Sequence, residues 1–168
     1  HDIGRSTANR VQWAYVASDD DGVDVEGRPE AAFFINATTH AREWGAPEVA
    51  AGTLERLVDG AGDQGLVRYL LDNTRVIVVP VHNVDGLLQT QRYPTDVLVG
   101  RDPDVPEEWP RDGRMRRKNM RGVDEVLTTT NDHLLGIDLN RNHPPFYATS
   151  DRSSPNPNSL VYHGTAAH

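Results

Sequence analysis

The feature that most constrains the fold is a short apolar run, residues 31–35, that leads directly into a group of chemically active side chains. The run has the length and composition of a buried β-strand, and the stretch that follows it is Thr38-Thr39-His40-Ala41-Arg42-Glu43-Trp44. Active groups gather at the carboxyl ends of strands in open α/β sheets. We therefore expect a buried strand over Ala31–Asn36 and a functional site immediately after it.

Within this stretch, His40 and Glu43 have the spacing of a metal-ligand pair. They are three residues apart, so on one helical turn both side chains leave the same face and can converge on one point. Zinc accepts nitrogen from histidine and oxygen from glutamate, and a catalytic site adds a third protein ligand and a water. The chain has no cysteine, so a zinc site here can use only histidine and carboxylate. Taken alone, such a pair is more often a helix start with a solvated glutamate.

The length and composition are those of one soluble domain. A chain of 168 residues, 37% hydrophobic and 25% charged, is about the size of a single domain with one core. No apolar run approaches the roughly 18 residues that a membrane-spanning helix needs. The net charge of −8 disfavours binding to nucleic acid, which requires a basic surface. We expect neither a membrane nor a nucleic acid as a partner, and the oligomeric state stays open.

Hydrophobic periodicity predicts the remaining elements. Strands are expected over residues 10–18, 76–81 and 134–139, and helices from Pro47 to Gly60 and over residues 66–71. The run over 76–81 is nearly continuous, which is typical of a strand covered on both faces. Asn83–Gly86 is interpreted as a turn, and His82 as a hydrogen-bonded core residue. Together these elements predict an α/β fold with a mixed, mostly parallel central sheet flanked by helices.

Two local patterns resemble binding loops but lack the required context. Asp19-Asp20-Asp21-Gly22 lacks the spaced oxygens and the closing glutamate of a calcium loop, so we expect a solvated turn. Gly60-Ala61-Gly62-Asp63-Gln64-Gly65 matches the dinucleotide fingerprint, but a helix precedes it where that fingerprint needs a strand. A glycine-rich linker between two helices is the simpler interpretation.

A basic cluster lies within a long segment of the chain, Tyr93–Asp132, that shows no period. Residues 111–121 carry six cations and one anion, whereas the chain as a whole is acidic. Arginine offers planar paired donors that suit a carboxylate or a developing oxyanion, so a small anion site is one interpretation. A solvated face or a patch for polyanions is the other, and composition does not choose between them.

Six stretches, taken in order, resemble the zinc metallocarboxypeptidases of the carboxypeptidase A type. They are Ile3–Ser6, His40–Trp44, Asn83–Gly86, Arg114–Asn119, Gly136–Asn142 and Tyr162–Gly164, and they extend over almost the whole chain. The chain departs from the family pattern at Val84, where proline is usual, at Arg116, where tryptophan is common, and at His143, where an aromatic residue is usual. We expect these departures to affect subsite shape more than chemistry.

The resemblance implies roles for six residues. His40 and Glu43 would be two protein ligands of one zinc ion (Zn2+), in a site of the two-histidine, one-glutamate type. The residues implied to bind substrate are Arg42, Arg117, Asn140 and Arg141. Of these, Asn140 and Arg141 would hold the terminal carboxylate, and Arg117 would also be catalytic, stabilising the oxyanion. The implied reaction is zinc-dependent hydrolysis of the C-terminal peptide bond of a peptide or protein with a free C-terminal carboxylate.

The resemblance also implies an incomplete domain. We expect residues 1–168 to form part of a single zinc carboxypeptidase-like catalytic domain, truncated at the C-terminus and also at the N-terminus. The third zinc ligand and the catalytic glutamate are expected beyond residue 168, so the chain alone should be inactive. Two alternatives stay open: a non-catalytic member that binds carboxylates or peptides, and a related zinc amidase acting on cell-wall peptides. An extracellular or periplasmic location is expected, and a cytoplasmic one is left open.

Overall fold

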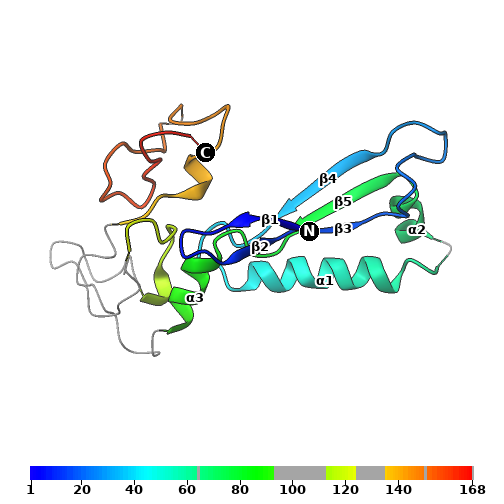
Figure 1. The fold of residues 1–168 in the computed structure, drawn as a ribbon, viewed down its shortest axis with the longest axis horizontal. Helices are drawn as coiled ribbons and strands as arrows, with labels where there is room; N and C mark the ends of the chain where they lie inside the picture. Colours follow the sequence, from blue (N-terminus) through cyan, green and yellow to red (C-terminus); the bar gives the residue numbers. More distant parts are fainter. Residues whose placement is uncertain (64, 93–112, 124–134, 150, 168) are drawn as a thin grey trace. The chain divides into compact units, whose positions relative to one another are not determined.

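The structure is a computed structural model that describes residues 1–63, 65–92, 113–123, 135–149 and 151–167 (Figure 1). The chain forms two compact units. Unit 1 comprises His1–Gly4, Val11–Ala37 and Gly45–His82, and unit 2 comprises Arg5–Arg10, Thr38–Trp44 and Asn83–His168. The prediction of one catalytic domain over the whole chain stays a prediction.

Unit 1 is built on a three-stranded sheet in the order β3–β5–β4 (Figure 1). The central strand β5 (Thr74–Val79) pairs antiparallel with β3 (Tyr15–Ala17) and parallel with β4 (Ala31–Asn36). A two-stranded sheet joins β1 (Asp2–Arg5) and β2 (Val11–Trp13). The prediction of an α/β fold with a mixed sheet is confirmed. A parallel majority is not found among the described strands, because β5 has one parallel and one antiparallel neighbour.

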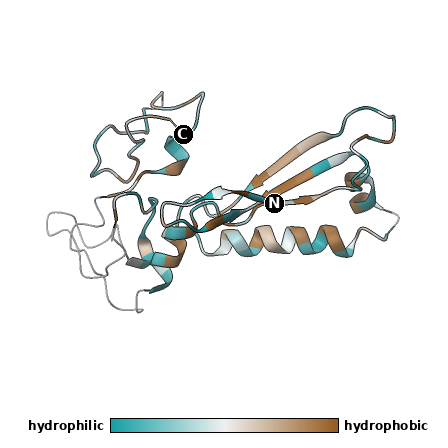
Figure 2. Cartoon of the chain, viewed as in Figure 1, coloured by the Kyte–Doolittle hydropathy of each residue, from teal (hydrophilic) through white to brown (hydrophobic). Residues whose placement is uncertain are grey.

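The helices of unit 1 lie where the apolar period predicts them. α1 (Gly45–Asp59) contacts β3 and β5, and α2 (Leu66–Leu71) follows it (Figure 1). The core consists mainly of aliphatic residues from α1, α2 and β5: Ala37, Ala50, Leu57, Leu71, Val76 and Val78. Figure 2 shows the hydrophobic residues along β4 and β5. Burial of this apolar surface holds α1 against the sheet.

The burial predicted for β4 is wrong, although its bounds are correct. Phe33 and Phe34 are 59% and 60% exposed. β4 pairs with β5 along one edge only, and within the described part of the chain α1 packs against β3 and β5 and leaves β4 largely uncovered. An apolar run therefore marks this strand correctly without indicating how much of it is covered.

The strand predicted over residues 10–18 is two strands, β2 and β3, in different sheets. The break is at Ala14, which is buried, donates its N–H to the His1 carbonyl at 3.0 Å and accepts from the N-terminal ammonium at 2.8 Å. Trp13 and Tyr15 on either side of it are half-exposed. His82 is hydrogen-bonded as predicted, with Nδ1 2.9 Å from Nδ2 of Asn36, although it is only partly buried.

Unit 2 contains one α-helix among its described residues, α3 (Val84–Arg92), where the sequence analysis expects a turn. Asn83 explains the difference, because its Oδ1 accepts the N–H of Gly86 at 3.1 Å and caps the first turn. Asp85 then joins α3 to the N-terminal segment, accepting hydrogen bonds from Ser6 Oγ at 2.8 Å and Arg10 Nη1 at 2.7 Å. These contacts bring Ser6 of the stretch Ile3–Ser6 against Asp85 of the stretch Asn83–Gly86.

The remaining described elements of unit 2 are 3-10 turns, η1 (Gly113–Met115) and η3 (Leu139–Arg141). The strand predicted over 134–139 is wrong for its described residues, because Asp138 accepts the N–H of Asn140 at 3.0 Å and begins η3. Most of Tyr93–Asp132 lies outside the described residues. No helix in the described ranges is long and apolar enough to cross a membrane.

Candidate metal and substrate-binding site

The stretch Thr38–Trp44 forms a tight turn in unit 2 rather than a regular helix. The Glu43 N–H donates to the His40 carbonyl at 3.2 Å and closes the turn. The Ala41 N–H donates to the carbonyl of Arg117 at 3.2 Å, which ties this turn to the basic segment. Ala41 is fully buried, so the turn is anchored at its centre.

His40 and Glu43 converge as their spacing predicts. Nδ1 of His40 lies 2.7 Å from Oε1 of Glu43. His40 is 8% exposed, whereas the Glu43 side chain is 48% exposed. His40 is therefore the buried member of the pair, and Glu43 is the member accessible to solvent. A nitrogen and a carboxylate oxygen meeting at one point are donors that zinc prefers, and the residues present therefore fit this metal.

Asp138 occupies the other side of the imidazole. Its Oδ1 lies 3.3 Å from Nε2 of His40, and its side chain is completely buried. A carboxylate in this position favours the tautomer with hydrogen on Nε2, which leaves the lone pair of Nδ1 for a metal. Burial alone would raise the pKa of Asp138, but the nearby imidazole of His40 and the charge of Arg117 outweigh it, and the pKa is lowered.

Arg117 and Arg42 surround the same carboxylate. Arg117 donates from Nε at 3.0 Å and from Nη2 at 2.8 Å to Oδ2 of Asp138. Burial, followed by the charge of Arg117, lowers the pKa of Arg42, while Glu43 and Asp138 oppose that shift. The two guanidinium groups therefore interact electrostatically, and Arg42 also interacts with the charge of Glu43. Arg42 and Arg117 thus place two cations at the site, and the carboxylates of Glu43 and Asp138 balance their charge.

Asn140 and Arg141 follow Asp138 on η3. Asn140 is exposed, and its backbone N–H is taken by Asp138. The guanidinium of Arg141 donates from Nη1 to the Asn140 carbonyl at 2.7 Å and from Nε to the Arg152 carbonyl at 3.2 Å. The backbone thus fixes the direction of this side chain. The site brings together His40, Glu43, Arg42 and Arg117, and Asp138 connects them to η3, which carries Asn140 and Arg141.

The sequence model of the zinc carboxypeptidase family matches residues 1–168. The chain belongs to this family. Mast cell carboxypeptidase A of Mus musculus is 31% identical over 138 residues, which cover 80% of this chain and 26% of that protein. A zinc carboxypeptidase of Saccharothrix mutabilis subsp. capreolus is 29% identical over 112 residues, or 60% of this chain and 25% of that protein.

A solved structure shows the same fold. The crystal structure of thrombin-activatable fibrinolysis inhibitor superimposes with a TM-score of 0.72 at 23% identity, covering 99% of this chain and 34% of that one. Like the curated relatives, it is much longer than this chain, which spans about a quarter of the length of those relatives. The carboxypeptidase-like α/β fold is therefore shown for a part of the family's domain.

Two ligands are not a complete zinc carboxypeptidase centre. Within the described ranges, no third histidine or carboxylate offers a ligand atom beside His40 and Glu43. The roles of all six predicted site residues stay predictions, because their geometry permits those roles without testing them.

Asp138 is a residue of this candidate site that the sequence analysis missed. It lies in the stretch Gly136–Asn142, where only the following asparagine and arginine received roles. Its signal was an acidic residue within an apolar run, Leu134 to Leu139, since a carboxylate at such a position must be buried with a partner. The partners, His40 and Arg117, are distant in sequence.

Two buried cations support the same segment. Arg116 is 1% exposed and donates from Nη2 to the carbonyls of Asn119 at 2.7 Å and Leu135 at 3.1 Å. Lys118 is 2% exposed and donates to the Pro157 carbonyl at 2.8 Å. The arginine that replaces the family's usual tryptophan is therefore a structural residue that binds backbone oxygens. Two of the six cations in the basic cluster, Arg116 and Lys118, are therefore engaged by backbone carbonyls of the chain itself.

Proposed function

We propose that the protein containing this chain is a zinc metallocarboxypeptidase that hydrolyses the C-terminal peptide bond of peptides or proteins. The observation that carries the proposal is the 2.7 Å approach of His40 Nδ1 to Glu43 Oε1 beside the Arg117 guanidinium. A metal-ligand pair next to fixed cations suits a substrate whose reacting carbonyl lies close to a carboxylate. Membership of the zinc carboxypeptidase family supports this assignment.

Each residue has a physical role in this proposal. His40 and Glu43 hold Zn2+, which when bound polarises a carbonyl and lowers the pKa of a bound water. Asp138 keeps His40 in the tautomer that presents Nδ1. Arg117 donates hydrogen bonds to the carbonyl oxygen as negative charge develops on it, a contribution typically worth about 3 to 4 kcal/mol per donor.

The substrate's carboxylate would be recognised by Asn140 and Arg141, with Arg42 contacting the substrate nearby. Arg141 is suited to this role because backbone carbonyls orient its guanidinium, and a planar guanidinium can bind a carboxylate through paired hydrogen bonds. The proposed substrate is therefore a peptide or protein with a free C-terminal carboxylate. We propose an extracellular or periplasmic location.

The test uses Glu43→Gln and His40→Ala in the full-length protein. Each change removes one ligand, so zinc retained after dialysis and the release of C-terminal residues should both fall to background. Glu48→Gln, an exposed change in the first turn of α1, is the matched control and should leave both unchanged. Full activity in either ligand variant would refute the proposal.

The same preparation separates the two alternatives. A non-catalytic member would bind peptides with a free C-terminal carboxylate, and lose that binding in Arg141→Ala, without releasing a residue. A cell-wall amidase would cleave cell-wall peptides faster than linear peptides of the same terminal residue. We expect neither pattern.

A further inference from the structure

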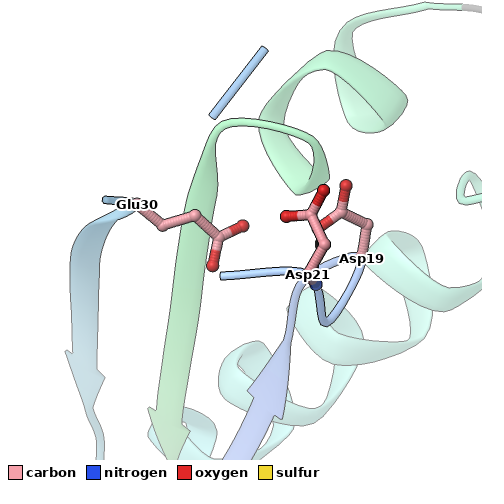
Figure 3. Close-up of side chains that lie close together, drawn as sticks. All are labelled: Asp19, Asp21 and Glu30. Carbon is pink, nitrogen blue, oxygen red and sulfur yellow. Dashed lines mark hydrogen bonds between the residues drawn. The ribbon is translucent and has the colours of Figure 1, made fainter. Parts of the chain in front are cut away.

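A second cluster of potential metal ligands lies in unit 1, where β3 connects to β4 (Figure 3). Asp19, Asp21 and Glu30 each present a carboxylate oxygen, and the three oxygens lie within 4.8 Å of one another. The two aspartates come just after β3, and the glutamate just before β4. The glutamate that the acidic turn lacks in sequence is therefore supplied by the chain returning to the sheet.

Glu30 is the decisive member of this cluster. Its side chain is only 2% exposed, and neither of its buried oxygens accepts a hydrogen bond from the described residues. Figure 3 shows its carboxylate directed toward Asp21 and Asp19. Buried carboxylates in proteins nearly always have hydrogen-bond partners. Here a buried acid faces two other acids.

The electrostatics of this position are unfavourable in the absence of a cation. Burial, followed by the charge of Asp19, raises the pKa of Glu30, and Asp21 and Asp20 act in the same direction. The opposing charge is Arg75, whose Nε lies 3.6 Å from Oε2 of Glu30, too far for a good hydrogen bond. Arg75 is partly exposed and opposes the charges of three neighbouring acids at Glu30, while Arg68 interacts with Asp19.

The backbone holds the cluster in place. The Val23 N–H donates to Oδ1 of Asp21 at 2.9 Å, and the Glu30 N–H donates to the Gly22 carbonyl at 3.3 Å. Gly22 has a φ of 77°, which lets the chain turn back toward Glu30. The acidic side chains are thus brought together by a defined loop, and their proximity does not depend on rotamers alone.

We propose that Asp19, Asp21 and Glu30 bind one calcium ion. All three ligands are carboxylate oxygens, which suit hard cations such as calcium and magnesium better than softer metals. Calcium binds oxygen at about 2.3 to 2.6 Å, so two ligands of one ion can be about 5 Å apart, and the observed spacing meets this limit. Magnesium requires a smaller and more regular shell. Asp21 is exposed, which leaves room for water as further ligands.

The ion would stabilise unit 1 locally. It would join the end of β3 to the start of β4 and cancel the repulsion around Glu30. Since a ligand that binds only the folded state raises its stability, the melting temperature should rise with calcium concentration. The site is separate in sequence and chemistry from His40 and Glu43, so it does not depend on the proposed peptidase activity.

The experiment titrates CaCl2 into the chelator-treated protein and records heat by calorimetry and Tm by circular dichroism. We expect one saturable site with a Kd of at most about 1 mM and a Tm several degrees higher at about 10 mM CaCl2. Glu30→Gln keeps the shape of the side chain and removes its charge, so Kd should rise at least about tenfold. In chelator alone its Tm should equal or exceed that of the wild type.

Three further variants test whether calcium binds at this cluster. Asp21→Asn should also weaken calcium binding. Because Asp21 is exposed, this change tests the site even if Glu30→Gln fails to fold. Glu26→Gln is the matched control, because Glu26 is 65% exposed in the same connection and pairs with Arg28. His40→Ala should bind calcium normally. No saturable heat and no Tm rise, or wild-type binding in both Glu30→Gln and Asp21→Asn, or loss of binding in His40→Ala, would overturn the proposal.

Discussion

Asp138 presents Oδ1 to Nε2 of His40 at 3.3 Å, while Glu43 approaches the other ring nitrogen at 2.7 Å. The imidazole therefore lies between two carboxylates with different surroundings. Asp138 is completely buried and also binds Arg117, whereas Glu43 is about half exposed. The buried carboxylate of Asp138 is suited to orient the imidazole ring, and the exposed carboxylate of Glu43 is accessible to bind a metal.

Asp138→Asn should weaken zinc binding without removing a ligand. Loss of the charge behind His40 lowers the basicity of its Nδ1, and changes of this kind typically reduce metal affinity about 10- to 100-fold. The measurement is competition with a chromophoric chelator. Asp151→Asn, an exposed change in unit 2, is the control and should bind zinc as the wild type does. Equal affinities in the two variants would show that Asp138 does not position His40.

The stability of the metal-free protein should fall in acid because of Asp138. Its folded-state pKa is lowered, so below the pKa of an unfolded aspartate, about 3.9, the unfolded state binds more protons than the folded state. The stability that Asp138 contributes is therefore complete above about pH 5 and is lost as pH falls through the folded pKa. Urea unfolding in chelator should show a steeper loss below about pH 4 in the wild type than in Asp138→Asn. Parallel curves would contradict this assignment.

Arg117→Lys should reduce kcat far more than it changes KM in the full-length protein. Lysine keeps the charge but cannot reproduce the paired Nε and Nη2 contacts to Asp138, nor a planar donor to the carbonyl oxygen. A loss of about 100-fold or more in kcat is expected for a donor that acts in the transition state. Arg121→Lys, at an exposed position in the same segment, is the control. A pure KM effect would assign Arg117 to substrate binding alone.

Local patterns predict the regular elements of unit 1 and the convergence of His40 with Glu43. β4 and both helices follow from apolar period, and the metal-ligand pair follows from a spacing of three residues. What sequence reasoning misses depends on contacts between distant residues. The burial of β4 depends on which strands α1 covers, and Asp138 acquires its role only when it meets His40. Glu30 likewise joins Asp19 only after the chain returns to the sheet.

Local rules also fail where side chains cap the backbone. Asn83 and Asp138 each begin a helical turn by accepting an N–H, of Gly86 and Asn140 respectively, so an expected turn becomes α3 and an expected strand end becomes η3. Both residues suit turns as well as caps, and the sequence alone does not distinguish the two.

Two glycine-to-alanine changes should affect stability in opposite directions. Gly136 has a φ of 91°, and a Cβ there would lie 2.1 Å from the carbonyl oxygen of Asn119. That backbone cannot shift easily, because the Asn119 N–H donates to the Ile137 carbonyl at 3.0 Å and Asn119 Oδ1 accepts the Ile137 N–H at 2.8 Å. Gly136→Ala should therefore cost about 3 kcal/mol or more in the free energy of unfolding.

Gly52 is the matched site for the opposite result. It lies inside α1, and an added Cβ meets no atom within 4 Å. Alanine is favoured over glycine in a helix interior, so Gly52→Ala should raise the free energy of unfolding by about 0.5 to 1 kcal/mol. Urea unfolding of both variants measures the difference. Because both changes add one methyl group, only the backbone conformation and the surrounding atoms differ between them. Similar effects at the two positions would contradict the close approach of residues 136 and 119.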